Sequence, residues 1–292
     1  MTIKELLNEG VEMLSISDGA LLNCEVLLGH VLGYETEQLI TNCDEEVEDN
    51  LAKLFLEYIR RVDDGEPVEH ITNSKEFYGL DFYVDNRVLI PRPETEQIVE
   101  RLITYIDANQ ELGRHFRLLD VGTGSGNIPI SVLSHYLGRS DEVIDYFDAL
   151  EVSEEALEVA RINAGQHGIE DKIRLLQSDL LEVIDEGQEY DAIVANLPYI
   201  GEEKHRFVSA AAQKYEPNVA LFGGNDGLQL YRRMFEELRD KNIGFELMMG
   251  EFGFAQSEDM AELLAEFYEG RSAIVPDLAG IDRIFIVGNL SA

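Results

Sequence analysis

The sequence predicts a doubly wound α/β fold with a seven-stranded, mostly parallel sheet, preceded by a small helical domain. Seven short apolar runs follow residue 115, and helical segments separate the first five, which is typical of a parallel sheet covered on both faces. The last two runs are joined only by Pro276–Asp282, which is too short for a parallel crossover, so the final strand should be antiparallel. The region before residue 67 shows helical periodicity alone. The expected strands span residues 117–121, 146–152, 173–177, 190–195, 243–250, 273–275 and 283–288.

Residues 1–70 are expected to form the compact helical domain. Thr2 and Glu5 have the spacing of a capping box, in which the two residues satisfy each other's backbone N–H groups at a helix start. Further helices are expected over residues 36–40 and 45–62. This region brings together too few polar side chains to hold an active site, so we expect it to dock a substrate.

Another helix of this domain is expected over Ala20–Leu32, with Gly33 as its stop. Its inward face is expected to be formed by apolar residues at helical spacing: Leu21, Leu22, Val26, Leu27 and Val31.

A β-hairpin linker is expected over residues 71–92. Apolar residues between Glu76 and Ile90 alternate with the period of a strand, and Asp85-Asn86 is the expected turn. Two prolines stiffen the exit, and a helix from Glu94 to about Asn109 opens the domain formed by residues 93–292.

Composition indicates a globular protein with an unusual charge. The 292 residues include 58 acidic and 23 basic side chains, a formal charge of −35. Such a field repels phosphate backbones, so no direct contact with nucleic acid is expected. The acidity suits either a salt-rich cytoplasm or a basic protein partner, and both explanations stay open. No apolar run is long enough to span a membrane, the N-terminus lacks a signal peptide, and two cysteines form no metal cluster, so a cytoplasmic protein without a metal is expected.

The first functional motif is a glycine-rich turn between a buried strand and a helix. It contains Gly122, Thr123, Gly124, Ser125 and Gly126. Glycines let a backbone approach a ligand closely and expose N–H groups at the helix start. The spacing is Gly-x-Gly-x-Gly after an aspartate rather than the Gly-x-Gly-x-x-Gly that wraps a pyrophosphate. A ligand without phosphates, such as S-adenosylmethionine, fits this pattern better.

The next two strand ends carry groups that suit the same cofactor. Glu151 ends the second strand, where its carboxylate can accept hydrogen bonds from both ribose hydroxyls. Asp179 ends the third strand and can meet the adenine amino group, with Leu180 packing on the ring. A mostly parallel sheet with a terminal antiparallel hairpin and these three strand ends predicts a class I S-adenosylmethionine-dependent methyltransferase, with S-adenosylhomocysteine as the product.

The fourth strand end indicates the reaction. Asn196, Leu197, Pro198 and Tyr199 follow it directly. An amide nitrogen is a poor nucleophile, but the Asn196 side-chain oxygen and the Leu197 carbonyl can hold its two N–H groups and aim the nitrogen at the methyl group. Pro198 would fix the turn, and Tyr199 would stack on a flat substrate group. Catalysis then consists of positioning and electrostatics without a general base.

These residues resemble a known family. Asn-(Pro/Leu)-Pro-Tyr is shared by amino-group methyltransferases, including adenine-N6 enzymes that act on DNA or RNA, so the motif alone leaves the substrate open. Further segments resemble the HemK/PrmC family of release factor glutamine-N5 methyltransferases. They are Val88–Glu96 (VLIPRPETE), Lys214–Pro217 with Ala220–Leu228 (ALFGGNDGL), and Gly250–Gln256 (GEFGFAQ) with Gly280–Arg283.

The resemblance implies a substrate and a set of site residues. In this family the enzyme methylates the glutamine of the Gly-Gly-Gln motif in class I peptide-chain release factors, and the helical domain helps to dock them. Gly122–Gly126, Glu151, Leu180 and Asn196 would contact the cofactor, while Asn196–Tyr199 would hold the glutamine. An adenine-N6 methyltransferase and a binding protein without activity are the alternatives. A monomer is expected.

The chain departs from the family pattern at four positions. Leu197 replaces the usual first proline of the motif, and Glu151 replaces the commoner aspartate. Asn73 stands where glycine is usual, and Gln213 stands where arginine is usual. The first change should matter little, because the carbonyl of residue 197 is its working group.

Overall fold

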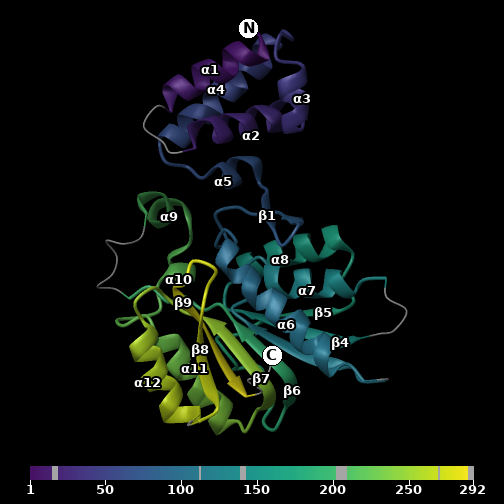
Figure 1. The fold of residues 1–292 in the computed structure, drawn as a ribbon, viewed down its shortest axis with the longest axis vertical. Coiled ribbons are helices and arrows are strands. Elements are labelled where there is room, and N and C mark those ends of the chain that lie inside the picture. The colour runs from purple at the N-terminus through teal and green to yellow at the C-terminus, as the bar shows by residue number, and fades with distance from the viewer. Residues whose placement is uncertain (15–18, 112, 139–142, 202–208, 269, 289–292) are drawn as a thin grey trace. The chain divides into compact units, whose positions relative to one another are not determined.

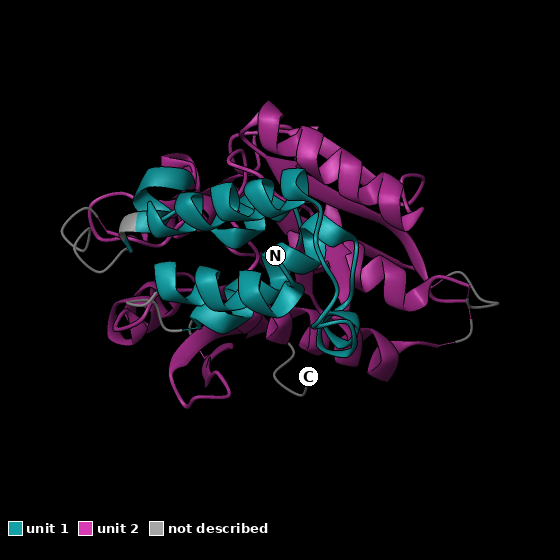
Figure 2. Cartoon of the chain, turned by 90° about the horizontal axis from the view of Figure 1, so that it is seen from above, with its two compact units in different colours: residues 1–74, 209–215 teal, residues 75–208, 216–292 magenta. Residues whose placement is uncertain are grey.

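The computed structural model describes residues 1–14, 19–111, 113–138, 143–201, 209–268 and 270–288. The chain divides into two compact units (Figure 1, Figure 2). Residues 1–74 and 209–215 form the helical unit, and residues 75–208 and 216–292 form the sheet unit.

The helical unit is built from short helices around an apolar core. Leu6, Leu27 and Phe55 lie at its centre and are fully buried. The predicted capping box is confirmed, since the Glu5 N–H donates to the Thr2 hydroxyl at 3.2 Å and the Thr2 N–H donates to the Glu5 carboxylate at 2.9 Å. The helices are α1 (Ile3–Met13), α2 (Ala20–Leu32), α3 (Thr36–Thr41), α4 (Asp49–Asp63), α5 (Val68–Thr72) and α9 (Ala210–Tyr215).

Helix α2 has the predicted bounds but not the predicted inward face. Gly33 ends it in a left-handed conformation with φ 67°, as expected. Its buried face is formed by Cys24, Leu27, Leu28 and Gly29. Three of the residues expected to point inward are instead exposed: Leu21, Leu22 and Val26. Apolar residues occur on all sides of this helix, so their spacing did not identify the packed face.

The sheet unit contains the predicted seven-stranded sheet, in the order β5-β4-β3-β6-β7-β9-β8. The first five of these strands along the chain pair in parallel, and β9 is antiparallel to both β7 and β8, which confirms the predicted terminal hairpin. The strands are β3 (Phe116–Val121), β4 (Ile144–Glu151), β5 (Ile173–Gln177), β6 (Glu189–Ala195), β7 (Gly244–Glu251), β8 (Ser272–Pro276) and β9 (Asp282–Gly288).

Helices cover both faces of this sheet, because alternate residues of each strand point to opposite sides. In β3, Leu118 joins the core beneath α6 and α7, whereas its neighbour Leu119 joins the core beneath α11 and α12. The helices of this unit are η1 (Pro93–Thr95), α6 (Glu96–Asn109), α7 (Asn127–Tyr136), α8 (Glu154–His167), α10 (Asn218–Leu221), α11 (Gln229–Asp240) and α12 (Ser257–Tyr268).

Two expectations about the connections are wrong. The small hairpin pairs β1 (Lys75–Phe77) with β2 (Leu80–Phe82), so it turns at Tyr78-Gly79 and not at Asp85-Asn86. Both turn residues have positive φ, 52° and 73°, as a two-residue turn that follows the strand twist requires. The connection from β5 to β6, residues 178–188, contains turns and no helix, although a helix was expected there.

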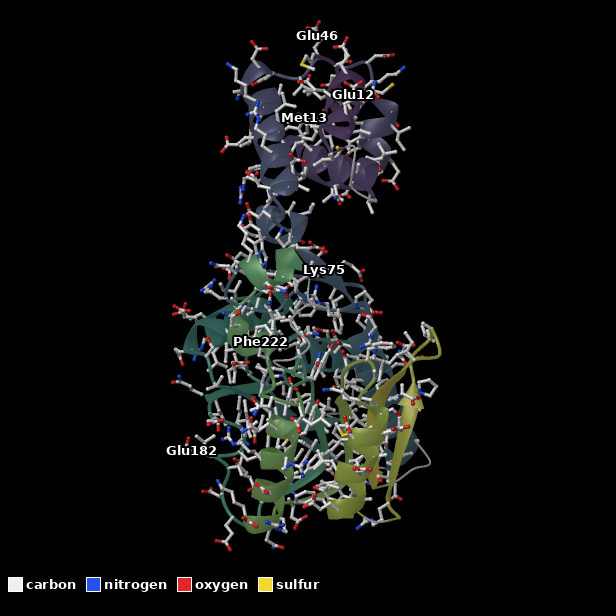
Figure 3. All side chains as sticks on the ribbon, turned by 90° about the vertical axis from the view of Figure 1, so that its left-hand side faces the viewer. Glu12, Met13, Glu46, Lys75, Glu182 and Phe222 are labelled. Carbon is white, nitrogen blue, oxygen red and sulfur yellow. The ribbon has the colours of Figure 1, made fainter. Side chains whose placement is uncertain are left out.

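Charged side chains cover the surfaces of the two units. Glu12 and Glu46 of the helical unit and Glu182 of the sheet unit are exposed (Figure 3). None of the described helices is both long and apolar enough to cross a membrane.

Candidate active site

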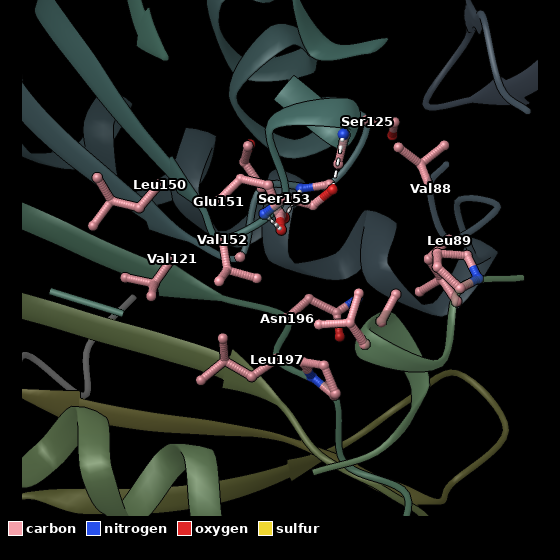
Figure 4. Close-up of a pocket in the computed structure, with 18 of the residues that line it drawn as sticks. Val88, Leu89, Val121, Ser125, Leu150, Glu151, Val152, Ser153, Asn196 and Leu197 are labelled. Atoms are coloured by element: carbon pink, nitrogen blue, oxygen red, sulfur yellow. Dashed lines mark hydrogen bonds between the residues drawn. The ribbon is translucent and has the colours of Figure 1, made fainter. Parts of the chain in front are cut away.

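A cavity lies at the carboxyl ends of the central strands, where the predicted motifs converge (Figure 4). Its wall includes Gly122–Ser125 after β3, Glu151 at the end of β4, Asp179-Leu180 after β5 and Asn196–Pro198 after β6. Two of the predicted site residues, Gly126 and Tyr199, lie outside this wall.

The glycine-rich turn is shaped by close contacts that exclude larger residues. Gly122 has φ 80°, and a Cβ atom there would come within 3.0 Å of the Leu197 side chain. Gly126 is the N-cap of α7 rather than a wall residue. The buried Asn163 amide of α8 donates to the Ser125 carbonyl at 2.9 Å and so holds the turn from behind. The sequence analysis did not identify Asn163.

Glu151 lies beneath this turn with both carboxylate oxygens engaged. One oxygen accepts the Gly124 N–H and the other accepts the Ser153 N–H, each at 3.0 Å. Burial raises the pKa of Glu151, while these backbone N–H groups act in the opposite direction. Because each carboxylate oxygen can accept a second hydrogen bond, the group retains the capacity to hold two ribose hydroxyls.

Asp120 is a second buried carboxylate beside the turn, and it was not predicted as a site residue. It is 1% exposed, and burial raises its pKa to about 7, with the negative charge of Glu151 acting in the same direction. The Thr123 hydroxyl acts in the opposite direction and lowers the pKa of Asp120. Two carboxyl groups therefore lie beside the turn, and Asp120 is only partly ionised near pH 7.

The third strand end lines the rim of the cavity. Leu180 is buried with φ 49°, so its side chain is presented to the pocket by an unusual backbone conformation. The Asp179 carboxylate accepts a hydrogen bond from the Arg233 guanidinium of α11 at 2.9 Å and is half exposed. The carboxylate that is predicted to contact adenine therefore also forms an ion pair with Arg233.

Asn196 is held by residues that are far away in sequence. Its side-chain amide donates to the Thr95 hydroxyl of η1 at 3.0 Å, and Thr95 donates to the Glu251 carboxylate at the end of β7 at 2.6 Å. Glu251 also accepts from the Tyr199 hydroxyl at 3.0 Å. Thr95 and Glu251 are nearly fully buried. Both belong to segments that resemble the family, but no local pattern indicated that they meet.

Leu197 uses a backbone group that proline would lack. Its N–H donates to the Tyr231 hydroxyl of α11 at 3.3 Å. The same hydroxyl contacts the carbonyl oxygens of Glu251 and Ala195 and is buried. Tyr231 thus satisfies the extra donor that leucine introduces at this position.

The loop that begins at Asn196 is also braced from its far side. The buried Gln256 amide donates to the carbonyls of Tyr199 and Asp226, each at 2.9 Å. A Cβ atom on Gly227 would collide with the Tyr199 carbonyl oxygen. The segment Ala220–Leu228 therefore requires glycine where it touches the active-site loop.

Arginines on the cavity wall are already paired with carboxylates. Arg92 contacts the buried Glu216 at 2.7 Å, and Glu216 also accepts the Ile90 N–H at 3.2 Å. Arg87 contacts Asp85 at 2.7 Å and Glu158 at 2.9 Å. These pairs reduce the attraction of the pocket for phosphate groups.

The donor set fits S-adenosylmethionine. The wall places the Glu151 carboxylate where the ribose hydroxyls of the cofactor can reach it, whereas a dinucleotide would bring negative phosphates to a cavity whose two arginines are already paired. The fold and the site together define a class I S-adenosylmethionine-dependent methyltransferase.

Comparisons with known proteins agree with this class. The PrmC N-terminal domain family matches residues 5–72, and the Methyltransferase small domain family matches residues 99–238. The release factor glutamine methyltransferase of Clostridium acetobutylicum is 35% identical over 265 residues, covering 90% of this chain and 89% of the relative. That of Koribacter versatilis is 33% identical over 290 residues and 98% of each chain. The chain therefore belongs to the release factor glutamine methyltransferase family, whose members transfer a methyl group from S-adenosylmethionine.

A solved structure supports the fold alone. The hMettl16 catalytic domain, in complex with the MAT2A 3′UTR hairpin 6, has a TM-score of 0.53 and 17% sequence identity, covering 82% of each chain.

Proposed function

We propose that this chain methylates the side-chain amide nitrogen, N5, of the glutamine in the Gly-Gly-Gln motif of class I peptide-chain release factors. The observation that carries the proposal is that Asn196–Pro198 and the glycine-rich turn line one cavity, so amide acceptors lie beside the cofactor site. Membership of a family whose relatives are named for this activity supports the choice of substrate.

The chain's contribution to the reaction is to hold the glutamine amide. The Asn196 side-chain oxygen and the Leu197 carbonyl accept its two N–H groups, which presents the nitrogen to the methyl group. When bound, S-adenosylmethionine supplies an electrophilic methyl group on a sulfonium. The amide nitrogen would take up this methyl group and give up one proton to water, so no side chain of the site has to act as a base. Such positioning in a preorganised polar site accounts for catalysis without a general base.

Glu151 and Leu180 are assigned to the cofactor. The Glu151 carboxylate accepts from the ribose hydroxyls through its remaining lone pairs, and Leu180 packs on the adenine ring. Asp179 is assigned to the adenine amino group through the oxygen that does not contact Arg233. Tyr199 lies outside the cavity wall, and with its hydroxyl anchored on Glu251 it is assigned to holding the Asn196–Pro198 segment in place.

The helical unit is assigned to docking the release factor. Among its described residues, the buried side chains are apolar apart from His70, so we assign specific recognition to its surface. Residues 1–74 carry 17 acidic and four basic side chains, which would attract a basic protein surface.

An adenine-N6 methyltransferase is disfavoured by two observations. A nucleic-acid substrate needs cationic side chains for its phosphates. Arg87 and Arg92 at the cavity are paired with carboxylates, and the chain carries a charge of −35.

The test is to incubate the purified chain with S-adenosylmethionine and an unmodified class I release factor, then map peptides by mass spectrometry. We expect a single added methyl group on the Gly-Gly-Gln glutamine. A release factor with glutamine replaced by alanine at this position is the matched substrate control and should remain unmodified. Label on total RNA, with none on the release factor, would instead support the adenine-N6 function.

A further inference from the structure

The amide of Asn196 is tied to a short chain of polar groups that runs away from the cavity. The chain runs from the Asn196 amide nitrogen to the Thr95 hydroxyl at 3.0 Å, and from there to the Glu251 carboxylate at 2.6 Å. It joins three separate elements, the end of β6, the helix η1 and the end of β7. Thr95 is 1% exposed and Glu251 is 2% exposed, so water does not replace these contacts.

The direction of these hydrogen bonds follows from the chemistry of the groups. An ionised carboxylate only accepts hydrogen bonds, so the single proton of the Thr95 hydroxyl is donated to Glu251. The hydroxyl oxygen then has only lone pairs to offer to Asn196, and it must receive the NH₂ end of the amide. The carbonyl end of Asn196 is consequently left for the cavity.

Groups around Glu251 favour its charged form against the effect of burial. Burial raises the pKa of Glu251, and the nearby Glu94 carboxylate acts in the same direction. The Thr95 and Tyr199 hydroxyls donate to the two carboxylate oxygens, and the Arg283 guanidinium adds a favourable charge.

We propose that Thr95 and Glu251 are positioning residues that set the orientation of the Asn196 amide, so that the site accepts hydrogen bonds from its substrate. An asparagine amide can rotate by half a turn with little change in shape, and the rotated form would present NH₂ instead of oxygen. Two donors would then face each other when a glutamine amide enters. Through this polarity the pair selects a substrate nitrogen that carries N–H groups. The inference rests on the proposed role of Asn196 as an acceptor.

Glu251 supports a second member of the same motif. The Tyr199 hydroxyl contacts the carboxylate oxygen that Thr95 does not use. One buried carboxylate thus anchors both ends of the Asn196–Tyr199 segment. Loss of its charge should disturb both the amide and the aromatic ring.

The kinetic test compares three variants in the full chain. Thr95→Val keeps the shape and removes the hydroxyl, and it should lower kcat about 10- to 100-fold, less than the roughly 100- to 1000-fold seen when a group that contacts the transition state is lost, because Thr95 acts through Asn196. Thr95→Ser restores the hydroxyl and should recover most of kcat. In Glu251→Gln the glutamine NH₂ can donate to the Thr95 hydroxyl, which reverses the direction of the hydrogen bonds between residues 251, 95 and 196. This variant should lower kcat at least as much as Thr95→Val. The dissociation constant for S-adenosylmethionine, measured by calorimetry, should change less than about threefold in all three, as expected for groups that act on the transition state.

The second test reads the amide directly and needs no release factor. In protein labelled with ¹⁵N on asparagine side chains, the NH₂ signal of Asn196 is identified by its absence in Asn196→Ala. We expect slow hydrogen exchange for this signal in the wild type and in Thr95→Ser, and at least tenfold faster exchange in Thr95→Val, because a hydrogen-bonded amide must open before it exchanges.

The outcomes separate this inference from the proposed substrate. Unchanged exchange in Thr95→Val, or a Glu251→Gln enzyme with wild-type kcat, would overturn the positioning role. Protected exchange that depends on the Thr95 hydroxyl, in a protein that leaves release factors unmethylated, would retain the positioning role and reject the substrate. A melting temperature within a few degrees of the wild type excludes general unfolding as the cause.

Discussion

The two units differ in what they bury. Among the described residues, thirteen polar or charged side chains other than tyrosine are buried, and twelve of them lie in the sheet unit. His70 is the remaining one and lies in the helical unit. Burying a polar group lowers the free energy of unfolding unless the group is hydrogen-bonded. The concentration of such groups in the sheet unit therefore indicates a functional site there. The described part of the helical unit is held together mainly by apolar packing.

The largest effect is expected from a residue whose polar end faces the cavity. Asn196→Ala removes one of the two acceptors for the substrate amide and should lower kcat about 10³-fold, comparable to losing a donor that stabilises a transition state. The affinity for S-adenosylmethionine should stay within about tenfold of the wild type, since the lost interaction acts mainly in the transition state. Single-turnover methylation and calorimetry measure the two quantities. Turnover at the wild-type rate would refute the role of Asn196.

The next largest effect is a change with pH in the free energy of unfolding, which we expect from Asp120. Its folded-state pKa of about 7 lies above the usual value near 3.8, so its stabilising contribution is present below pH 4 and is lost as the pH rises through 7. The difference corresponds to roughly 4 kcal/mol in the free energy of unfolding. Asp120→Asn should remove this loss, which urea unfolding between pH 4 and 8 would reveal as a flatter stability curve.

The helical unit provides the control for this pH effect. Glu12 is exposed there, and Glu12→Gln should leave the shape of the stability curve as in the wild type. If Asp120→Asn had the same pH dependence as the wild type, the buried carboxylate would not be the origin of the effect.

A smaller effect is expected at the contact between Leu197 and Tyr231. Tyr231→Phe leaves the buried Leu197 N–H without its partner, which should lower the free energy of unfolding by about 1–3 kcal/mol. In the background of Leu197→Pro, which has no N–H, the same substitution should cost about 1 kcal/mol less. Urea unfolding of the four proteins completes the cycle. Equal costs in both backgrounds would show that Tyr231 stabilises the unit through its other contacts.

The site residues that sequence analysis missed have one property in common. Each contacts its partners only because the fold brings together segments that are far apart in the sequence. The strands were predicted within two residues because each is an apolar run, a property of adjacent positions. The glycines, Glu151 and Asn196 were predicted because each lies at or directly after the end of a strand. Thr95 and Glu251 meet Asn196 only through the fold, at 101 and 55 positions' separation in the sequence, and no local pattern reports such proximity.

The misplaced turn and helix face have local causes. Asp85-Asn86 resembles a turn in composition, yet the chain turns at Tyr78-Gly79, where a large residue adopts a positive φ that sequence rules disfavour. In α2, apolar residues on every side left the packed face ambiguous, and the contacts of Cys24 and Leu28 decided it. The local pattern was misleading at the turn and ambiguous in α2.

The smallest effect is expected on the surface of the helical unit. If its acidity attracts release factors, the double variant Glu12→Gln, Glu46→Gln should raise KM for the release factor about two- to threefold at low salt, because exposed charges act mainly on association. The effect should fade near 0.5 M salt, where the screening length is only about 4 Å. The matched control is Glu182→Gln on the sheet unit, which should leave KM unchanged, and all three substitutions should keep the affinity for S-adenosylmethionine. Equal KM values for both variants and the wild type would remove these charges from docking.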